Sequence, residues 1–300
     1  MVKRSSLTDL LGRGIVFCDF YSETIYQLEE LEECGEAEWQ IHCHNDHIQP
    51  TSHEEYTSGF EKLMTALRSG RFEKIVYTRT KKETLKRSLD EIFKDLNKNY
   101  LNTFNYFLSS PELGCWMGAS PEKLCEIQDE KISAVSLAGT KNKSEKWTDK
   151  EIEEQLYVTR YIESVFKSLY CTNISIDGPH NLQAGPVQHL HTILSGTLPS
   201  REMWRKVIED LHPTPATCGI PARKSKELIR DIEGYNRSLY TGFIGIFTDE
   251  FKQCYVNLRC MQILNQDVIL YVGGGITAAS EIEKEWQETE RKARTLTQFL

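Results

Sequence analysis

Two glutamates and a lysine near the C-terminus occupy positions that a helix would bring to one face. Glu285, Glu288 and Lys292 lie at i, i+3 and i+7, and residues three or four apart are neighbours on a helix surface. Carboxylates in such a row either form a solvated ladder of ion pairs or hold a cation. The solvated ladder is the more common outcome for a charged row, so this pattern alone favours it.

Another carboxylate lies near the start of an apolar helix face. Glu154 is in register with Val158, Tyr161 and Val165, and a charge in that position is costly unless it is paired or binds a metal. Two carboxylates from different helices would suit Mg²⁺, which takes few protein ligands and then a substrate oxygen. The alternative is a solvated glutamate, because Glu154 lies close to the predicted start of its helix.

A lysine and a glutamate in other parts of the chain could act as base and acid. Lys74 opens a predicted strand of mostly uncharged residues, and burial or a neighbouring cation lowers the pKa of such a lysine. Glu122 follows an apolar stretch and could be the paired acid. Both residues also have ordinary surface interpretations, and composition does not decide between them.

A guanidinium is expected in the middle of a predicted strand over residues 253–264. Arg259 shares a face there with Tyr255, Asn257 and Met261. The fixed fork of an arginine suits carboxylate recognition, so this pattern indicates an anion contact. Tyr240, on the preceding predicted strand, could donate a hydrogen bond beside it.

A run of three glycines separates a predicted strand from a predicted helix. Gly273–Ala278 matches a dinucleotide-binding fingerprint, but that motif opens a βαβ unit with an acidic residue about 20 positions later, and no such unit follows here. The remaining alternatives are a plain tight turn and an anion site made by free N–H groups near a helix start. The predicted helix that follows favours the anion site.

Imidazole and thiolate groups crowd a short stretch near the N-terminus. His42, Cys43, His44 and His47 offer zinc-ligand chemistry, but no matching second pair follows at zinc-finger spacing. A histidine-rich strand or loop is therefore the favoured interpretation.

The composition is that of a soluble globular chain with an acidic excess. The 300 residues carry a formal net charge of −8, with 27% charged and 39% hydrophobic residues. An acidic balance argues against binding to duplex nucleic acid, which needs a basic surface. No apolar run approaches the ~20 residues of a membrane helix, and no signal peptide is recognised. Nine scattered cysteines without a CxxC pair predict a reducing, cytoplasmic location.

Hydrophobic periodicity and capping signals predict strands in blocks between helices. Helices are predicted over 51–70, 88–100, 148–170, 200–211, 223–232 and 280–300. Strands are predicted over 74–80, 102–108, 113–118, 123–127, 131–137, 174–176, 187–198, 240–248, 253–264 and 268–272. Capping boxes are expected at Thr51 with Glu54 or Ser52 with Glu55, at Thr148 with Glu151, and at Ser280 with Glu283. Several strands alternate polar and apolar residues, so we expect an α+β fold with largely antiparallel sheets.

A series of short segments carries a family resemblance from about residue 55 to residue 300. The segments are EKIVYTR around Lys74, GASPEKL at 118–124, SLAGT at 136–140, the predicted helix with Glu154, QHLHTILSGTL at 188–198, LHPTPATCGIP at 211–221, YNRSLYTGFIG at 235–245, NLRC at 257–260, YVGGGI at 271–276 and EKEWQETERKA at 283–293. Each segment is weak alone. In register they resemble the chorismate-utilising enzymes, which include isochorismate, salicylate, anthranilate and aminodeoxychorismate synthases.

Two alanines select among the members of this family. Ala138, in SLAGT, stands where one group of aminodeoxychorismate synthases carries a nucleophilic lysine. Ala216, in LHPTPA, stands where amine-transferring members usually carry Thr. The sequence is therefore similar to isochorismate synthase. Salicylate synthase, which adds pyruvate elimination, and a non-catalytic chorismate-binding homologue are the alternatives.

The resemblance implies a general base, a general acid and a Mg²⁺ cofactor. Lys74 matches the base that activates water for attack at ring C2, and Glu122 matches the acid that protonates the departing C4 hydroxyl. These roles require a neutral lysine and a protonated glutamate, so their pKa values must be pushed towards each other. Glu154 and Glu288 match Mg²⁺ ligands, with Glu285 close by, through water.

The resemblance also implies substrate contacts and a fold. Arg259 and Tyr240 match groups that hold the enolpyruvyl carboxylate; Gly139, Thr140, Gly274 and Lys292 match other substrate contacts, and His189 a residue beside the ring. The implied fold is a two-sheet, largely antiparallel sandwich flanked by helices. We expect a chorismate-binding catalytic domain over 51–300 and an N-terminal segment over 1–50 packed on it. A monomer without a glutaminase subunit is predicted, and a menaquinone or a siderophore pathway stays open.

Overall fold

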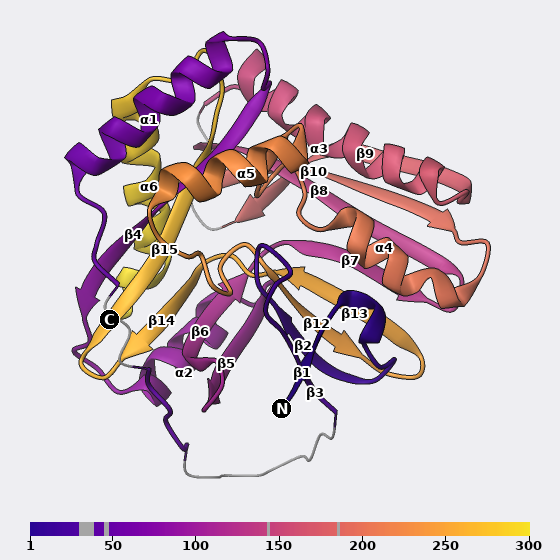
Figure 1. The fold of residues 1–300 in the computed structure, drawn as a ribbon, viewed down its shortest axis with the longest axis horizontal. Helices are drawn as coiled ribbons and strands as arrows, with labels where there is room; N and C mark the ends of the chain where they lie inside the picture. The colour runs from indigo at the N-terminus through magenta and orange to yellow at the C-terminus, as the bar shows by residue number, and fades with distance from the viewer. Residues whose placement is uncertain (30–38, 45–47, 143–144, 185–186) are drawn as a thin grey trace.

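The structure is a computed structural model that describes residues 1–29, 39–44, 48–142, 145–184 and 187–300. In these residues the strands form two sheets, every strand pair is antiparallel, and helices lie on the outer sides (Figure 1). The expected α+β class with two largely antiparallel sheets is confirmed. None of the helices within the described ranges combines the length and apolar character needed to cross a bilayer.

The larger sheet has nine strands in the order β1-β3-β2-β12-β13-β7-β8-β10-β9 among the described residues. These strands are β1 (Val2–Arg4), β2 (Gly14–Cys18), β3 (Ile25–Leu28), β7 (Lys123–Gln128), β8 (Lys131–Asn142), β9 (Thr172–Ala184), β10 (Val187–Thr197), β12 (Phe243–Phe247) and β13 (Phe251–Val256). The first three come from the N-terminal segment, and β2 pairs with β12 along its whole length. Residues 2–28 are thus strands and connections of the main sheet.

The smaller sheet has six strands in the order β11-β4-β15-β14-β6-β5, again counting only described residues. They are β4 (Lys74–Thr84), β5 (Phe104–Ser110), β6 (Gly114–Ser120), β11 (Gly219–Ile220), β14 (Cys260–Leu264) and β15 (Asp267–Ile276). At its centre β4 pairs with β15 from Ile75 opposite Ile276 to Thr84 opposite Asp267. This long pair brings the first and the last parts of the matching sequence side by side.

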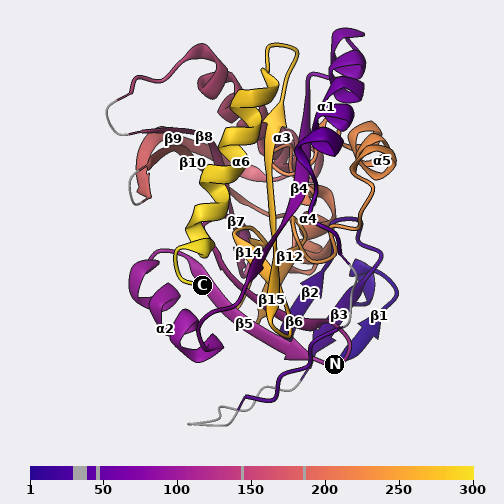
Figure 2. The same cartoon turned by 90° about the vertical axis from the view of Figure 1, so that its left-hand side faces the viewer.

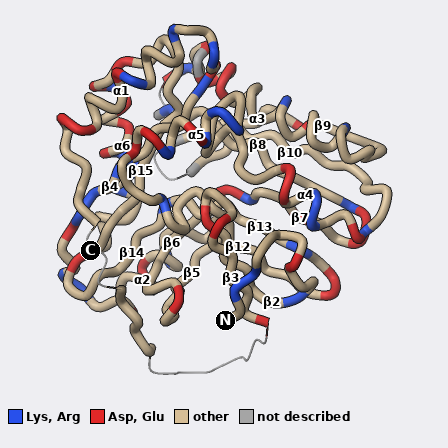
Figure 3. Tube along the Cα trace, viewed as in Figure 1, with Lys and Arg blue, Asp and Glu red and all other residues tan. Residues whose placement is uncertain are grey.

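Helices cover both sheets. They are α1 (His53–Arg68), α2 (Leu89–Asn99), α3 (Asp149–Ser168), α4 (Trp204–Leu211), α5 (Ala222–Glu233) and α6 (Ile282–Thr297), with short 3-10 helices η1 (Leu7–Asp9) and η2 (Arg201–Met203). Figure 2 shows α6 running along β15 and α1 along β4, while α3 packs on β8 and β10. Lysines, arginines and acidic residues are interspersed along the trace (Figure 3).

Four apolar clusters of the described residues account for this arrangement of layers. One lies between the larger sheet and α3 with α4, and includes Phe166 and Phe243. A second joins the two sheets, with Ile244 of the larger sheet near Trp116 and Tyr271 of the smaller one. The other two lie under α1, α5 and α6, and under α2 with the end of α6. Burial of these side chains holds the sheets together, at roughly 25 cal/mol per Å² of apolar surface removed from water.

Helix α1 starts where its capping signal predicted. The Glu55 N–H donates to Ser52 Oγ at 3.1 Å, and the Ser52 N–H donates to the Glu55 carboxylate at 2.8 Å. At the last helix the prediction was wrong, because α6 begins after Glu281 and Ser280 does not cap it. Ser280 Oγ instead donates to Glu285 Oε1 at 2.7 Å, so its hydroxyl orients a carboxylate of the helix.

The strand predicted over 253–264 is two strands, and this corrects the expected place of Arg259. The chain leaves the larger sheet after Val256 and joins the smaller sheet at Cys260. Arg259 lies in this crossing with a left-handed backbone, φ +48°. Asn257 holds the crossing, since its Oδ1 accepts from the Tyr106 hydroxyl at 2.8 Å and its Nδ2 donates to Leu239 O at 2.9 Å. Arg259 is therefore not a mid-strand residue.

Two further expectations about local structure were wrong. Tyr240 lies in a turn before β12, where its N–H donates to Arg237 O at 2.9 Å, and not on that strand. Gly273, Gly274 and Gly275 lie inside β15, paired with Thr78, Tyr77 and Val76. They form neither a tight turn nor an anion site at the start of α6, because the helix begins only at Ile282.

A buried ion pair joins α5 to the smaller sheet. Arg237 donates to both carboxylate oxygens of Glu233, at 2.6 and 2.7 Å, and the two side chains are 0% and 1% exposed. Arg237 also donates to Val76 O and to Thr217 O, both at 2.9 Å. Glu233 in turn accepts from the Thr78 N–H at 2.9 Å. This pair therefore fixes several separate segments to one another.

We expect Arg237→Met to lower the free energy of unfolding by about 3–5 kcal/mol, because it leaves the Glu233 charge buried without a counterion. Equilibrium urea unfolding measures the loss. Arg230→Met is the matched control, since its pair with Glu23 at 2.6 Å is 54% and 62% exposed and is worth at most about 1 kcal/mol. Equal losses in the two variants would contradict the structural role of Arg237.

Candidate active site

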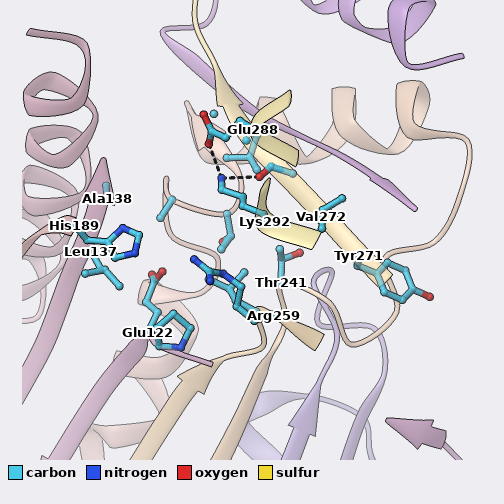
Figure 4. Close-up of a pocket in the computed structure, with 18 of the residues that line it drawn as sticks. Glu122, Leu137, Ala138, His189, Thr241, Arg259, Tyr271, Val272, Glu288 and Lys292 are labelled. Carbon is cyan, nitrogen blue, oxygen red and sulfur yellow. Dashed lines mark hydrogen bonds and ion pairs between the residues drawn. The ribbon is translucent and has the colours of Figure 1, made fainter. Parts of the chain in front are cut away.

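A cavity of about 140 Å³ opens between segments of both sheets, α3 and α6. This is room for several water molecules, or for a small ligand that displaces them. Many of the residues singled out in the sequence line it, and Figure 4 shows several of their side chains directed into one space. Those that line it are Glu122, Gly139, Glu154, His189, Tyr240, Arg259, Gly274, Glu288 and Lys292.

Glu122 is a buried carboxyl group in the wall of this cavity. It lies between β6 and β7, is 3% exposed, and its Oε1 has no hydrogen-bond partner among the described residues. Burial raises the pKa of Glu122 to about 8, against a smaller lowering by the charge of Lys74. The group is therefore mostly protonated at pH 7 and can donate a proton into the cavity.

His189 faces the same space from β10 (Figure 4). Burial, and then the charge of Arg259, lower the pKa of His189 to about 4, so the ring is neutral at pH 7. Its Nδ1 lies 3.1 Å from Gly139 O, which can only accept, so Nδ1 carries the proton and Nε2 is an acceptor. Gly139 has φ +70°, and a Cβ there would lie 3.0 Å from the Cβ of Glu151 in the first turn of α3.

Arg259 brings a positive charge into the cavity from the crossing between the sheets. Its Nη1 donates to Thr295 Oγ1 at 3.0 Å, and among the described residues no carboxylate lies within ion-pair distance of it. Tyr240 lies in the same wall, 5% exposed, and burial raises the pKa of its phenol so that it stays a neutral donor. A guanidinium with a phenol beside it can bind a ligand carboxylate.

Lys292 joins α6 to β15 at the opposite side of the cavity. Its ammonium pairs with Glu288 Oε1 at 2.7 Å and donates to Gly273 O at 2.8 Å, as the dashed lines in Figure 4 mark. The charge row predicted on the last helix is thus partly an internal ion pair, but it borders the cavity rather than open solvent.

Lys74 and Glu154 form an ion pair over the glycine strand. Lys74 Nζ lies 2.7 Å from Glu154 Oε1, and the two side chains are 1% and 23% exposed. A Cβ added at Gly275 would lie 2.3 Å from Lys74 Cε and 2.8 Å from Glu154 Oε1. The glycine is required because these side chains occupy the place of its own. Glu154 is therefore paired, and the alternative of a solvated glutamate at a frayed helix end is wrong.

Three of the predicted site residues are not among the described residues that line the cavity. Lys74 reaches its edge through Glu154, and Glu285 lies behind Gly274, where an added Cβ would meet its Oε2 at 3.3 Å. The side chain of Thr140 lies outside the described part of the chain. Thr217 and Thr241 line the cavity although neither was expected there from the sequence, because a threonine has no pattern that marks it as a contact.

The carboxylates around β15 fit Mg²⁺ by their chemistry and their number. Glu285 and Glu288 approach Gly274, at 3.3 and 3.5 Å from an added Cβ, and Glu154 approaches the next glycine. Within the described ranges no three His, Cys, Asp or Glu side chains are gathered closely enough to form a complete metal cage. Mg²⁺ usually takes one or two carboxylates and completes its shell with water and substrate oxygens, so these carboxylates suit it.

The described residues of the histidine-rich stretch do not line this cavity. His44 Nε2 lies 2.8 Å from Pro111 O, and the His42 N–H donates to Ser109 Oγ at 2.9 Å, so both contact the β5–β6 hairpin. His47 lies outside the described residues. The described part of the stretch forms no zinc site.

Comparison with known proteins shows that both the sequence and the fold are similar to chorismate-binding enzymes. The family model "Chorismate binding enzyme" matches residues 18–300. The isochorismate synthase DhbC of Bacillus subtilis (strain 168) is 27% identical over 277 residues, which cover 84% of this chain and 69% of that protein.

Two solved structures share the fold. The structure of a putative 2,3-dihydroxybenzoate-specific isochorismate synthase, DhbC, from Bacillus anthracis superimposes with a TM-score of 0.82 at 21% identity, covering 99% of this chain and 90% of that one. The menaquinone-specific isochorismate synthase MenF of Escherichia coli gives a TM-score of 0.83 at 20% identity, covering 100% and 84%.

We expect a pH titration of Glu122, followed by NMR of carboxyl-labelled glutamate, to give a pKa of about 8. Because the charge of Lys74 lowers this pKa, Lys74→Met should raise it further. Assignment of the resonance by its loss in Glu122→Gln is the control. Titration near the ordinary value of 4.5 would show that the carboxyl is hydrated and would contradict the buried environment.

Proposed function

Because this chain belongs to the family of chorismate-binding enzymes, whose model matches residues 18–300, we propose that it is an isochorismate synthase. The reaction is an isomerisation in which a hydroxyl group leaves C4 of chorismate and another is added at C2. The observation that carries this proposal is one cavity that contains a protonated carboxyl, a lysine held at its edge and an arginine without a described carboxylate partner.

Substrate binding follows from the charges around the cavity. Chorismate carries two carboxylates, and Arg259 with Tyr240 would hold the enolpyruvyl carboxylate by charge-assisted hydrogen bonds. Lys292 adds a second cation on the far side. These cations make the cavity locally favourable for a dianion, although the chain as a whole carries a net charge of −8 that would repel one.

Glu122 is the proposed general acid. The C4 hydroxyl is a poor leaving group as hydroxide, so its departure needs a proton at the moment the C4–O bond breaks. A pKa of about 8 keeps that proton available at pH 7 and makes its transfer easier than from an ordinary alcohol or water. Such proton transfer contributes typically 10²–10⁴-fold to the rate.

Lys74 is the proposed general base. The oxygen of a water molecule bonds to C2 while Lys74 takes its proton, the ring double bonds shift, and the C4 hydroxyl leaves as water with the proton of Glu122. One proton moves from water to Lys74 and one from Glu122 to the departing hydroxyl, and the reverse reaction uses the two groups in exchanged roles. In the resting pair with Glu154, at 2.7 Å, Lys74 is an ammonium. It acts as the base after it has lost a proton, and Glu154 stabilises the ammonium that forms again when the proton of water arrives.

Glu154 and Glu288 would hold Mg²⁺, with Glu285 contributing through water. When bound there, Mg²⁺ supplies neutralisation of the ring carboxylate and polarisation of the diene. A carboxylate has two oxygens, so Glu154 could stay paired with Lys74 through one oxygen and act as a metal ligand through the other. His189, neutral at pH 7, offers an acceptor beside the ring without adding charge.

Two neighbouring activities differ from this one in the nucleophile or in a second reaction step. Salicylate synthase also eliminates pyruvate after attack at C2, and amine-transferring relatives use ammonia in place of water. Ala138 and Ala216 both line the cavity and argue for water as the nucleophile. Of the two related structures, one is named as menaquinone-specific and the other as 2,3-dihydroxybenzoate-specific. A menaquinone or siderophore pathway, a cytoplasmic location and a monomeric state stay predictions for this chain.

Incubation with chorismate and Mg²⁺, coupled to an isochorismatase, tests the proposed function. We expect isochorismate to form, and chelation with EDTA to abolish its formation until Mg²⁺ is restored. The absence of isochorismate at every pH near neutrality would contradict the proposal. Salicylate fluorescence without the coupling enzyme would assign the pyruvate-eliminating activity of a salicylate synthase. An amine product with ammonium present would assign the amine-transferring activity.

We expect Lys74→Ala and Glu122→Gln each to lower kcat by at least ~10²-fold, because each removes one proton-transfer group. Stopped assays with purified variants, after circular dichroism has shown an intact fold, measure this. The matched controls are Lys82→Ala, on the same strand as Lys74, and Glu126→Gln, on the strand that follows Glu122, since both side chains are partly exposed and paired at the surface. An active Lys74→Ala enzyme would show that another group activates the water.

A further inference from the structure

A buried arginine outside the cavity directs all its described side-chain contacts to α6. Arg79 lies on β4 and is 2% exposed. Its Nε donates to Thr289 Oγ1 at 2.8 Å, and its guanidinium forms an ion pair with Glu290. The Cζ atom lies 3.8 Å from the ring centroid of Trp286, a cation–π distance. One rigid, planar group therefore grips three residues of the helix.

These three residues lie on the helix face that adjoins the acidic one. At 100° per residue, 286, 289 and 290 form a stripe about 120° from the stripe of 285, 288 and 292. Side-chain atoms extend to roughly 5–6 Å from the helix axis, so a rotation of ~20° would move the carboxylates by about 2 Å. The direction of the metal-binding carboxylates thus depends on what prevents this rotation.

Helix α1 contacts the Trp286 ring as well. The Trp286 ring contacts Tyr56 edge-on at 5.2 Å and His53 at 4.8 Å between centroids. With the Arg79 guanidinium on the same ring, the indole is wedged between β4 and α1. Rotation of α6 in either direction would break one of these contacts.

We propose that Arg79 is a positioning residue that fixes the rotation of α6 and so aims Glu285 and Glu288 at the metal site. The inference rests on the proposed function, which assigns those carboxylates to Mg²⁺. Arg79 does not line the cavity and touches neither substrate nor metal. Its effect passes through the helix alone.

The neighbouring lysine provides a matched control. Lys81 lies two residues further on the same strand and pairs with the same glutamate, Glu290 Oε2, at 2.7 Å. It is 27% exposed and has no described contact with Thr289 or Trp286. Loss of Lys81 removes a charge from the same carboxylate without releasing the helix face that Arg79 grips.

The test measures metal binding directly, with Mn²⁺ as a paramagnetic substitute for Mg²⁺ and no substrate present. Electron paramagnetic resonance counts the free Mn²⁺ in titrations of the full chain, and the steady-state assay gives kcat and KM. We expect the wild type and Lys81→Met to bind Mn²⁺ with equal affinity. Arg79→Met should bind it 10- to 100-fold more weakly, the usual effect of losing a partner that orients ligands.

Conservative variants separate positioning from general stability. Arg79→Lys keeps a charge for Glu290 but loses the planar fork and the bond to Thr289, so an intermediate affinity is expected. Thr289→Val keeps the side-chain shape and serves if Arg79→Met does not fold. A loss of thermal stability alone would leave the affinity of the folded protein unchanged.

Two outcomes overturn the inference, and they are distinguishable. If the wild type binds Mn²⁺ and is active while Arg79→Lys and Thr289→Val bind it as Lys81→Met does, Arg79 has only a structural role. If the wild type itself fails to bind Mn²⁺, the metal site of the proposed function is wrong and the inference fails with it.

Discussion

A buried ammonium needs a carboxylate beside it, and the glycines of β15 provide the room for that pair. Lys74 is almost completely buried and meets Glu154 at 2.7 Å, where a side chain on Gly275 would collide with both. Without the carboxylate, the cost of burying the charge would oppose folding. The pair therefore requires three elements to meet at one point: β4, which carries Lys74, α3, which carries Glu154, and β15, which carries Gly275.

The cost of burying an unpaired charge also explains the distribution of charge around the cavity. Glu288 is neutralised by Lys292, and Glu154 by Lys74. Glu122 has no cation paired with it among the described residues, and it is mostly protonated at neutral pH because burial penalises its charged form. Arg259 has no carboxylate partner within the described residues, which leaves it for an anionic ligand. The cavity thus has two kinds of acid. Glu154 and Glu288 are anions that can bind a cation, and Glu122 is neutral and can transfer a proton.

The crossing between the two sheets places the anion-binding group. Residues 257–259 leave the larger sheet and enter the smaller one, and Asn257 holds the turn through Tyr106 and Leu239. A continuous strand would have placed Arg259 on a flat sheet face. The break places it between the sheets, where the cavity lies. Apolar packing between Ile244 and Trp116 with Tyr271 keeps the sheets in contact behind it.

Local signals in the sequence determined the elements and, through family resemblance, the residues of the candidate site. Capping and periodicity located α1 and α3, because these depend on neighbours within four residues. Alternation indicated antiparallel sheets for the same reason. Only the tertiary structure decided the break at Arg259, the strand conformation of Gly273–Gly275 and the Lys74–Glu154 pair. Each of these depends on contacts between residues far apart in the chain, and no periodic pattern records which distant side chain will occupy the space a glycine leaves.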